Sequence, residues 1–599
     1  MVATTTAAAA VRGIRPGSRV WVGSGCAVPL SLLAALEATG TPDIEYLSYL
    51  LSATGPETAR YRHRTFLVSG AQQKAVEEGR VEYVPMALAE VPRLLATGRL
   101  RVDAALLQVT PPDARGFVSL GISVDLAQAI LETGCPAIAE INPNMPRTHG
   151  QSHVPAARFE ALVETTARIA EYIHPPAGEA IGRIARYVAA LIEDGSTLQF
   201  GLGRLPAETM KHLAHHRDLG LHDDVLTDGI VDLALSGALT GARKSRYRYR
   251  IVGSTAFGTR KLYDFVHDNP GIAMLPIDQV ADPLVIAEQH RMVSVMQAFA
   301  IDVTGQPSVD QYDGRVYGGV STLNAFMRGA ARSQGGKSIL CLASLGPDGQ
   351  SAIRPSLRAG ESAGIARSGV HYVVTEWGIA HLFGRSVRER ALALIEIAHP
   401  NFRDALLKEA AGLGYLRPGQ QLASQRAWPV EEERRVRLKD GAELLVRPSR
   451  AGDAEALRDL FHRMRPEDQY TRFFRRMRSL SQAEAESLCN VNHDSEVAFL
   501  AVTGERDAET VIASAVYFVN PETNMAEVAF MVAPDFQNRG LGTAMQAVLA
   551  DFARRKGVRG FVVETLRGNR PMWRLAMAAP GTKTIESEDD IVRVTTLFG

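Results

Sequence analysis

The sequence predicts an α/β chain in which two similar α/β halves, 11–177 and 178–415, precede a linker over 416–435 and a separate α+β domain over 436–599. Three observations predict this organisation. In both halves, short apolar runs alternate with helical stretches, as in βα units around a parallel sheet. A glycine signature recurs at the same spacing in each half. The linker is rich in proline, glycine and charge and cannot bury enough apolar surface to pack alone.

The first half shows the alternation clearly. We expect a strand over 19–25 (RVWVGSG), a helix over 29–38 (PLSLLAALEA) and a strand over 102–109 (VDAALLQV). The proline pair at 175–176 then interrupts the helical pattern, and a new βα series begins with the helix before Asp194.

The last part of the chain has a different rhythm, with several strands in succession. We expect strands over 442–448, 497–502, 511–519 and 526–532, with an amphipathic helix over 454–464. A glycine-rich helix start follows the last of these strands. This succession predicts a separate α+β domain.

The composition excludes several classes of protein. Lysine plus arginine equals aspartate plus glutamate, 66 of each, so no net field attracts nucleic acid or an anionic membrane. The run KSRYRYR at 244–250 alternates basic and aromatic residues, and we interpret it as a half-solvated strand. Four scattered cysteines without a CxxC or Cys/His cluster predict neither a metal site nor disulfides. No segment approaches the ~18 apolar residues of a membrane span. We expect a cytoplasmic protein without nucleic-acid, membrane or metal partners.

The repeated signature predicts two glycine-rich turns. Its copies are Gly17-Ser18 followed after four residues by Gly23-Ser24-Gly25, and Gly195-Ser196 followed after four residues by Gly201-Leu202-Gly203. Each turn joins a strand to a helix, where free N–H groups and the helix dipole favour an anion; a tight turn without a ligand is the alternative. The candidate ligand-binding residues of the second copy are Gly201, Leu202, Gly203, Arg204 and Leu205.

Longer motifs in the two halves carry a family resemblance. The first half contains VDAALLQVTPPDARGFVSLGISVD and EINPNMPRTHG, and the second contains VTEWGIAHLFGRS and IAHPNF. These blocks resemble the acetyl-CoA hydrolase/transferase family, which includes the 4-hydroxybutyrate CoA-transferases, over most of 11–415. The resemblance implies two CoA-transferase-type α/β halves, with coenzyme A or acyl-CoA bound as a substrate mainly by the second half. The other substrate is a small carboxylate, and we expect a homo-oligomer.

The resemblance also nominates a nucleophile. In the family, a glutamate attacks the acyl-CoA carbonyl to give a mixed anhydride, CoA returns to form a glutamyl-CoA thioester, and an incoming carboxylate reverses the sequence. The family loop resembles GIHTEMFSDG, whereas 220–229 reads GLHDDVLTDG, so Asp224 stands at the nucleophile position. Its arm is shorter by one C–C bond, ~1.5 Å, and a misplacement of about 1 Å can cost ~100-fold in rate. Asp224 is therefore a candidate nucleophile or a carboxylate that only neutralises charge.

A second loop also departs from the family. The family sequence SGIGGQVDF corresponds to GGVSTLNAF at 318–326, with Leu323 and Ala325 in place of glutamine and aspartate. Gly318 and Gly319 remain candidate cofactor-binding residues, because glycine lets backbone N–H groups approach an oxyanion closely. Two interpretations stay open. The halves form a working CoA-transferase or hydrolase, or a non-catalytic acyl-CoA-binding regulatory or scaffold body.

The last domain carries a second resemblance. The segment QNRGLGT at 537–543 follows a strand, opens a long helix and matches the Q/R-x-x-G-x-G/A signature. It resembles GNAT N-acetyltransferases over about 440–599. In that family, N–H groups at the helix start hold the CoA pyrophosphate. The implied cofactor-binding residues are Val532, Gln537, Asn538, Arg539, Gly540, Gly542, Thr543 and Asn569.

The GNAT resemblance implies direct attack of an amine on the thioester, helped by a base. The strand before the motif splays from its neighbour in this family. Glu527 lies on that strand and is the candidate base; the alternative is a solvent-facing carboxylate. Ala576 stands where a tyrosine often acts as general acid. The start of the domain resembles acetyltransferases that modify protein lysines, which indicates a lysine acceptor and leaves small amines open. The sequence thus predicts a bifunctional transferase or, alternatively, a GNAT enzyme carrying a silent CoA-transferase-like body.

Overall fold

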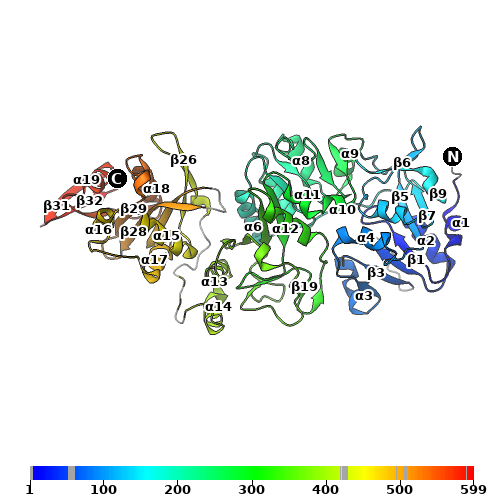
Figure 1. Cartoon of the computed structure of the whole chain (residues 1–599), viewed down its shortest axis with the longest axis horizontal. Helices are drawn as coiled ribbons and strands as arrows, with labels where there is room; N and C mark the ends of the chain where they lie inside the picture. The colour runs from blue at the N-terminus through cyan, green and yellow to red at the C-terminus, as the bar shows by residue number, and fades with distance from the viewer. Residues whose placement is uncertain are drawn as a thin grey trace. The chain divides into compact units, whose positions relative to one another are not determined.

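The computed structural model describes residues 4–50, 61–417, 420, 422, 430–493, 495–504, 509–588 and 590–598. The chain divides into two compact units, Met1–Glu376 and Trp377–Gly599 (Figure 1). The predicted α/β class is confirmed, since the first unit is built on parallel sheets and the second on a mainly antiparallel one. The predicted domain limits stay predictions, and residues 418, 419, 421 and 423–429 of the predicted linker lie outside the described residues.

The N-terminal sheet of the first unit is parallel throughout. In spatial order its strands are β4 (Val81–Tyr83), β3 (Arg62–Thr65), β2 (Glu45–Ser48), β1 (Arg19–Val22), β5 (Ala104–Val109), β7 (Ala137–Ile141) and β9 (Ala161–Glu164). Its helices are α1 (Ala7–Ala10), α2 (Leu30–Thr39), α3 (Gln73–Glu77), α4 (Val91–Ala96) and α5 (Ala127–Glu132). The strand order reverses between β1 and β5. The strands predicted over 19–25 and 102–109 and the helix predicted over 29–38 are confirmed.

A second parallel sheet repeats this plan. Its strands in the first unit are β11 (Gly220–Leu221), β10 (Thr197–Gln199), β16 (Met292–Gln297), β21 (Lys337–Cys341) and β23 (Tyr372–Thr375). Its helices are α6 (Glu179–Leu191), α7 (Arg204–Lys211), α8 (Gly229–Leu235), α9 (Arg260–Val266), α10 (Ile277–Val280), α11 (Pro283–Ala287) and α12 (Leu323–Arg332). The order reverses between β10 and β16, and ligands of open α/β sheets bind at such a switch point.

Short strands fill the remaining segments of the first unit. They are β6 (Phe117–Ser119), β8 (His153–Pro155), β12 (Val225–Leu226), β13 (Ile251–Gly253), β14 (Thr255–Ala256), β15 (Ile272–Met274), β17 (Ala300–Asp302), β18 (Pro307–Ser308), β19 (Gln311–Tyr312), β20 (Arg315–Val316) and β22 (Ile353–Arg354). The two parts of the unit are joined by backbone bridges between Val68 and Gly318 and between Ala87 and Ser321.

The strand expected at 244–250 is wrong. This segment forms turns, and Tyr247 and Tyr249 have φ of 54° and 61°. The buried ammonium of Lys244 donates to the carbonyl of Leu221 at 2.6 Å and to that of Arg250 at 2.9 Å. These bonds close the segment into a loop. The alternation of residue types gave no sign of them, because both acceptors are backbone atoms.

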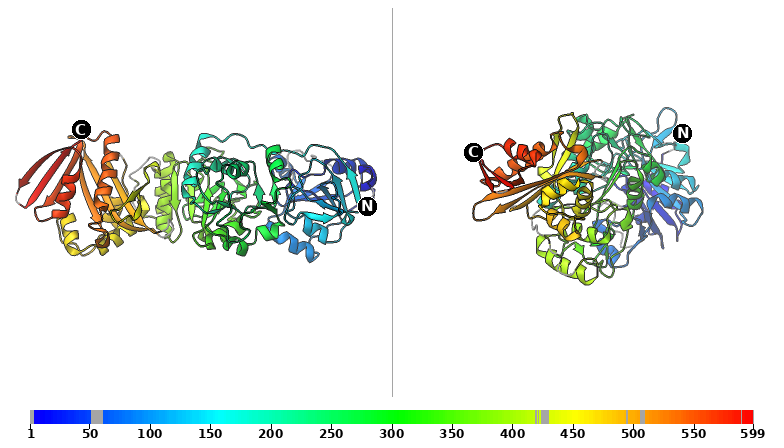
Figure 2. Two further views of the ribbon diagram at one scale, coloured as in Figure 1. Left: turned by 90° about the horizontal axis from the view of Figure 1, so that it is seen from above. Right: turned by 60° about the vertical axis from the view of Figure 1, so that its left-hand side comes forward.

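The second unit begins with β24 (Gly378–His381), α13 (Val387–Glu396) and α14 (Pro400–Gly412). Its sheet contains, in order, β25 (Arg434–Arg437), β26 (Glu443–Pro448), β27 (Glu496–Thr503), β28 (Thr510–Asn520), β29 (Met525–Val532), β30 (Gly560–Leu566), β32 (Ile591–Leu597) and β31 (Thr582–Glu588). Its helices are α15 (Ala454–Arg463), α16 (Pro466–Phe473), α17 (Gln482–Cys489), α18 (Leu541–Arg555) and α19 (Arg570–Ala578). Figure 2 shows the red β31–β32 hairpin at one edge of this sheet.

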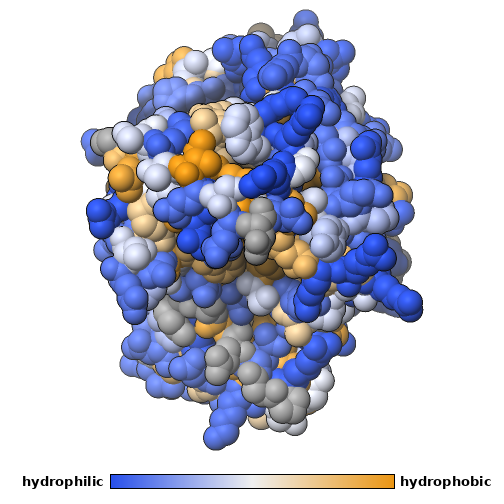
Figure 3. Space-filling view, turned by 90° about the vertical axis from the view of Figure 1, so that its left-hand side faces the viewer, coloured by the Kyte–Doolittle hydropathy of each residue, from blue (hydrophilic) through white to orange (hydrophobic). Residues whose placement is uncertain are grey.

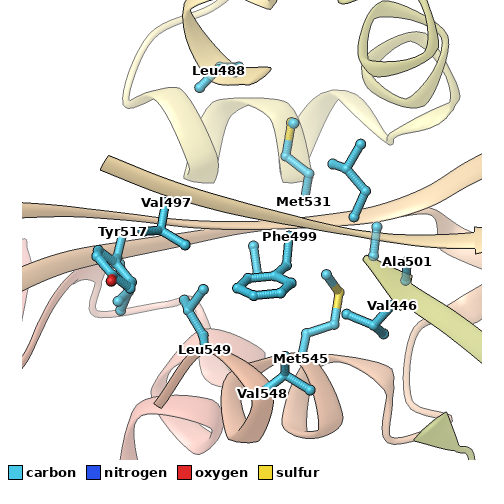
Figure 4. Packing of buried hydrophobic residues seen from close by; sticks show 14 of the residues in the cluster. Val446, Leu488, Val497, Phe499, Ala501, Tyr517, Met531, Met545, Val548 and Leu549 are labelled. Atoms are coloured by element: carbon cyan, nitrogen blue, oxygen red, sulfur yellow. The ribbon is translucent and has the colours of Figure 1, made fainter. Parts of the chain in front are cut away.

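The core of this unit lies on both faces of the sheet. Figure 4 shows Met545, Val548 and Leu549 of α18 against one face, around the ring of Phe499, and Leu488 on the other side. All are buried, so removing this apolar surface from water stabilises the unit.

The first strand begins within the segment predicted as linker. Arg434 opens β25, and its guanidinium contacts Asp551 at 2.7 Å. Glu432 accepts from Arg555 at 2.5 and 2.6 Å. The charge run over 432–437 is therefore an ion-paired edge of the sheet. Composition alone did not distinguish it from a solvated linker.

Candidate active sites

A cavity of about 600 Å³ lies at the carboxyl ends of the second parallel sheet, at the switch point between β10 and β16. This volume is within the usual range of small-molecule sites. The residues after four strands line it, because parallel strands place their carboxyl ends at one edge. The predicted residues that line it are Gly201, Leu202, Arg204, Leu205, Asp224, Gly318 and Gly319. The structure therefore brings together the three loops singled out from the sequence.

The glycine turn after β10 lies on one wall. Gly201 has φ of 66° and Gly203 has φ of 147°, and a Cβ on Gly203 would stand 2.7 Å from Nε2 of Gln297. Both positions favour glycine. In the first copy of the signature, Gly25 is required for packing, because a Cβ at this position would lie 2.1 Å from the ring of Phe257. Close packing between the two halves explains Gly25, so only the second copy belongs to this cavity.

Asp224 lies in the loop after β11 and is buried. One of its oxygens, Oδ2, accepts from the hydroxyl of Thr322 at 2.7 Å, while Oδ1 accepts no hydroxyl or N–H donor from the described residues. Its backbone carbonyl is fixed by the N–H groups of Ser254 and Thr255, at 3.1 and 3.0 Å. The backbone is thus held firmly, and the carboxylate has limited support from its surroundings.

Asp223 connects the nucleophile loop with the glycine turn. Its carboxyl accepts the N–H of Phe200 at 2.8 Å and that of Gly201 at 3.1 Å. Burial, and next the adjacent charge of Asp224, raise the pKa of Asp223 well above its ordinary range. The two carboxyl groups are within hydrogen-bond reach of each other. Two like charges at this distance cannot both ionise readily, so the proximity of Asp224 favours the protonated form of Asp223.

Two more buried acidic groups lie in this region, Tyr49 near Asp224 and Asp125 near Tyr49. Burial raises the pKa of Tyr49, and the charge of Asp224 adds to that effect. Burial also raises the pKa of Asp125. Few positive charges compensate here, since Arg204 is the only lysine or arginine among the described residues that line the cavity.

The second departure from the family also lies at this site. Leu323 lines the cavity at the start of α12, whereas Ala325 is not among the lining residues. Thr322 stands where the family loop has glycine, and its hydroxyl is the group that reaches Asp224. The loss of polar residues at Leu323 and Ala325 gives no sign of the hydroxyl gained at Thr322. The loop is anchored outside the cavity as well, because the N–H of Val320 donates to the hydroxyl of Tyr83 at 3.1 Å.

In the second unit, β29 and β30 separate in the middle of the sheet. They pair in parallel only at Met525, Ala526 and Glu527, although β29 continues to Val532. Beyond Glu527, the side of β29 that faces β30 has no strand partner, which leaves backbone groups for a ligand. Glu527 lies at the point of divergence and is exposed. The buried guanidinium of Arg472 on α16 interacts with its charge.

The glycine-rich turn before α18 has the geometry expected of an anion site. Asn538 and Gly540 have φ of 59° and 90°. Gly540 precedes Leu541, the first residue of α18, where N–H groups lack intrahelical acceptors. A Cβ on Gly542 would meet only Leu575, at 3.7 Å, so space is open above this helix start. Thr543 is exposed in the same turn.

Three predicted ligand residues make contacts within the protein. Gln537 donates through Nε2 to Asp468 at 2.9 Å and to the carbonyl of Val532 at 3.2 Å. Arg539 forms an ion pair with Asp440 at 2.6 Å. Asn569 caps α19, since its Oδ1 accepts the N–H of Met572 at 3.1 Å. Their contacts with CoA stay predictions. Ala576 is fully buried and offers no acid group.

Among the described residues, no group of three or more His, Cys, Asp or Glu side chains is arranged to hold a metal ion. Within the same residues, no helix has the length and apolar character needed to cross a bilayer.

Known proteins match each part of the chain. Residues 48–173 match the N-terminal domain and residues 258–410 the C-terminal domain of the acetyl-CoA hydrolase/transferase family. The 4-hydroxybutyrate coenzyme A transferase of Clostridium kluyveri is 37% identical over 412 residues, which are 67% of this chain and 96% of that protein. The chain belongs to the acetyl-CoA hydrolase/transferase family. The crystal structure of RipA from Yersinia pestis supports this membership, with 32% identity, a TM-score of 0.65 and coverage of 69% of this chain and 98% of RipA.

The fused domain of this family member also has a relative. Residues 454–578 match the GNAT acetyltransferase family. An acetyltransferase of Pseudomonas aeruginosa is 30% identical over 141 residues, 24% of this chain and 76% of that protein. The chain is therefore a transferase in which a CoA-transferase/hydrolase body is fused to a GNAT domain, and CoA thioesters are substrates of both. Both resemblances found in the sequence are confirmed.

Proposed function

We propose that the first unit exchanges CoA between an acyl-CoA and a small carboxylate through covalent intermediates on Asp224. The observation that carries the proposal is the position of this carboxylate, which lines the cavity between two glycine-rich loops and is held by Thr322 at 2.7 Å. The relative in C. kluyveri, a 4-hydroxybutyrate coenzyme A transferase, supports the same reaction type.

The proposed exchange of CoA passes through two covalent intermediates on Asp224. A carboxylate oxygen of Asp224 attacks the thioester carbonyl. The C–S bond breaks, the CoA thiolate departs, and an acyl-aspartyl anhydride is formed. The thiolate then attacks the aspartyl carbon and releases the acyl group as a free carboxylate, which leaves an aspartyl-CoA thioester. The second carboxylate reverses both steps and departs as the new acyl-CoA. Backbone N–H groups of the glycine loops are suited to stabilise the oxyanions. Hydrolysis follows if water replaces the second carboxylate.

Mass spectrometry of the intact chain tests this mechanism. The chain is incubated with acetyl-, propionyl- or butyryl-CoA and its peptides around Asp224 are mapped, with Asp224→Ala as the control. A CoA adduct on Asp224 that is absent from the variant supports the proposal. Bound CoA without any adduct or turnover refutes it and favours the alternative, a non-catalytic acyl-CoA-binding body.

We further propose that the GNAT domain transfers an acetyl group to an amine, with a protein lysine as acceptor and Glu527 as the base that removes the amine proton, directly or through water. The exposed position of Glu527 at the divergence of β29 and β30 supports this role. Asp224→Ala should leave amine acetylation unchanged, and Glu527→Gln should reduce it by about 10²- to 10⁴-fold. Equal acetylation by Glu527→Gln and the unmodified chain contradicts the role of Glu527.

Two properties complete the proposal. The chain acts in the cytoplasm, and it assembles as a homo-oligomer. Sedimentation velocity tests the second, since a monomeric mass at all concentrations excludes it.

A further inference from the structure

The surface of α16 and the loop after it has the composition of a binding surface. Tyr470 and Phe474 lie one helical turn apart and are 43% and 42% exposed. Arg465, Arg476 and Arg478 flank them and are exposed as well. Aromatic residues and arginine are the types enriched where protein partners bind tightly. We name these five residues the α16 face.

The α16 face carries positive charge without compensation. Residues 463–478 contain six arginines and two carboxylates in a chain whose total charge is zero. Arg475 is neutralised by Glu484. Within the described residues, the side chains of Arg465, Arg476 and Arg478 form no hydrogen bond or ion pair. Exposed, unpaired guanidinium groups favour partners that present carboxylates in the same arrangement.

The same helix touches the acyl-transfer site on its inner side. Helix α16 packs against β29, and Arg472 lies close enough to Glu527 for their charges to interact. Nε of Arg472 is buried and has no acceptor among the residues that the structure describes. Asp468 accepts from Gln537 at 2.9 Å and so joins α16 to the turn before α18. Only the thickness of this helix therefore separates a partner on the α16 face from the strand at which an amine would meet the thioester.

The surrounding surface does not offer a continuous apolar interface. Figure 3 shows apolar residues in separate patches among hydrophilic ones on the face turned to the viewer. A partner bound by apolar burial alone is not favoured by such a surface. Charge complementarity, with the two aromatic rings as anchors, fits it better.

We propose that the α16 face docks the acceptor protein through acidic residues beside the lysine that receives the acetyl group. This inference rests on the proposed N-acetyltransferase function and names the sequence context of its acceptor. The partner segment places a lysine at β29, carboxylates on Arg476 and Arg478, and apolar groups on Tyr470 and Phe474.

Peptide kinetics with the full chain test the inference. Three peptides carry one lysine flanked by aspartates, serines or arginines, and a small primary amine serves as a fourth acceptor. Each exposed ion pair contributes about two- to five-fold, so we expect kcat/KM to fall on the order of 10-fold from the aspartate to the arginine peptide. Raised salt should reduce this preference, because the pairs are exposed.

Charge reversal provides the matched comparison. Arg476→Glu/Arg478→Glu should reverse the order of the aspartate and arginine peptides and leave the small amine unchanged. Arg435→Glu/Arg559→Glu changes the net charge equally at exposed positions of β25 and the start of β30 and should preserve the order of the unmodified chain. A variant that loses small-amine turnover has lost its fold. In that case the inference is tested by the salt-dependent preference of the unmodified chain for the aspartate peptide.

Two results overturn the inference. Equal rates for the three peptides in the unmodified chain, with small-amine acetylation intact, exclude charge recognition and leave the acetyltransferase function standing. If both double variants shift the peptide preference equally, the preference depends on the net charge of the chain and not on the α16 face. Failure to acetylate any amine refutes the underlying function itself and is distinct from both results.

Discussion

Replacing Thr322 by valine removes the hydroxyl that holds Asp224 without changing the shape of the side chain. In the structure this hydroxyl donates to Oδ2 of Asp224 at 2.7 Å, and both residues are buried. No other hydroxyl or N–H group of the described residues donates to that carboxylate. The variant therefore leaves a buried carboxylate supported by Asp223 alone.

The magnitude follows from the nature of this bond. A hydrogen bond to a charged group contributes about 1.5–3 kcal/mol, and 1.36 kcal/mol corresponds to one pH unit. The carboxylate loses stabilisation only in its ionised form. We therefore expect the acid limb of the pH profile of kcat/KM for CoA transfer to move upward by roughly 1–2 pH units. Activity should fall on the acid side of the profile and recover as the pH is raised.

A direct assay of CoA transfer between two acyl groups across pH 5–9 measures the shift. Thr322→Ser is the matched control, because it keeps the hydroxyl and should keep the profile. Coincident profiles for the valine variant and the unmodified chain would falsify the claim that Thr322 supports the nucleophile. An equal shift in the serine variant would attribute the effect to packing.

Three further predictions concern the GNAT domain. Gly540→Ala forces an alanine to φ of 90° in the turn before α18, and it should weaken acetyl-CoA binding at least 10-fold, as measured by calorimetry. The control is Gly557→Ala, at φ of 76° with no other atom within 4 Å of the added Cβ. It has the same backbone strain and should leave the affinity for acetyl-CoA unchanged. The guanidinium of Arg447 lies 2.8 Å from the buried carboxylate of Asp453, and Arg447→Met removes this partner. The variant should lower the free energy of unfolding of this domain by about 3–5 kcal/mol, as measured by urea titration. An unchanged unfolding midpoint would contradict this expectation. Burial alone would raise the pKa of Asp453, but Arg447 lowers it to about 2; the stability from this pair should therefore be present above about pH 4 and fall as the pH drops towards 2, and the Arg447→Met variant should lack this dependence.

Much of the fold could be predicted from the sequence, because its signals are local. Glycine spacing and apolar runs located both strand-to-helix turns, and motif position nominated Asp224, Gly201 and Gly318, which the structure places around one cavity. The sequence did not reveal Asp223 or Thr322 as partners of that site. Asp223 acts on a loop more than 20 residues away, and Thr322 approaches Asp224 from a different helix start. Such contacts depend on tertiary packing and leave no periodic pattern.

The same limit explains two other differences. The loop at 244–250 is closed by Lys244, whose acceptors are backbone carbonyls and therefore carry no residue signature. Only the first two residues of β25, Arg434 and Arg435, fall within the predicted linker over 416–435. Their charge is typical of a linker, yet an edge strand tolerates charge when ion pairs such as Arg434–Asp551 neutralise it.

Gln537 gives the GNAT domain a way for one ligand to affect the affinity of the other. Its side chain joins Asp468 of α16 to the carbonyl of Val532, at the end of the strand that diverges from β30. A thioester that displaces this amide from the Val532 carbonyl removes one of the two contacts by which Gln537 connects that strand with α16. If bound thioester changes the affinity for the acceptor by some factor, bound acceptor must change the affinity for the thioester by the same factor, because the binding equilibria form a closed thermodynamic cycle. The size of this mutual factor is then limited by the free energy of breaking one amide contact.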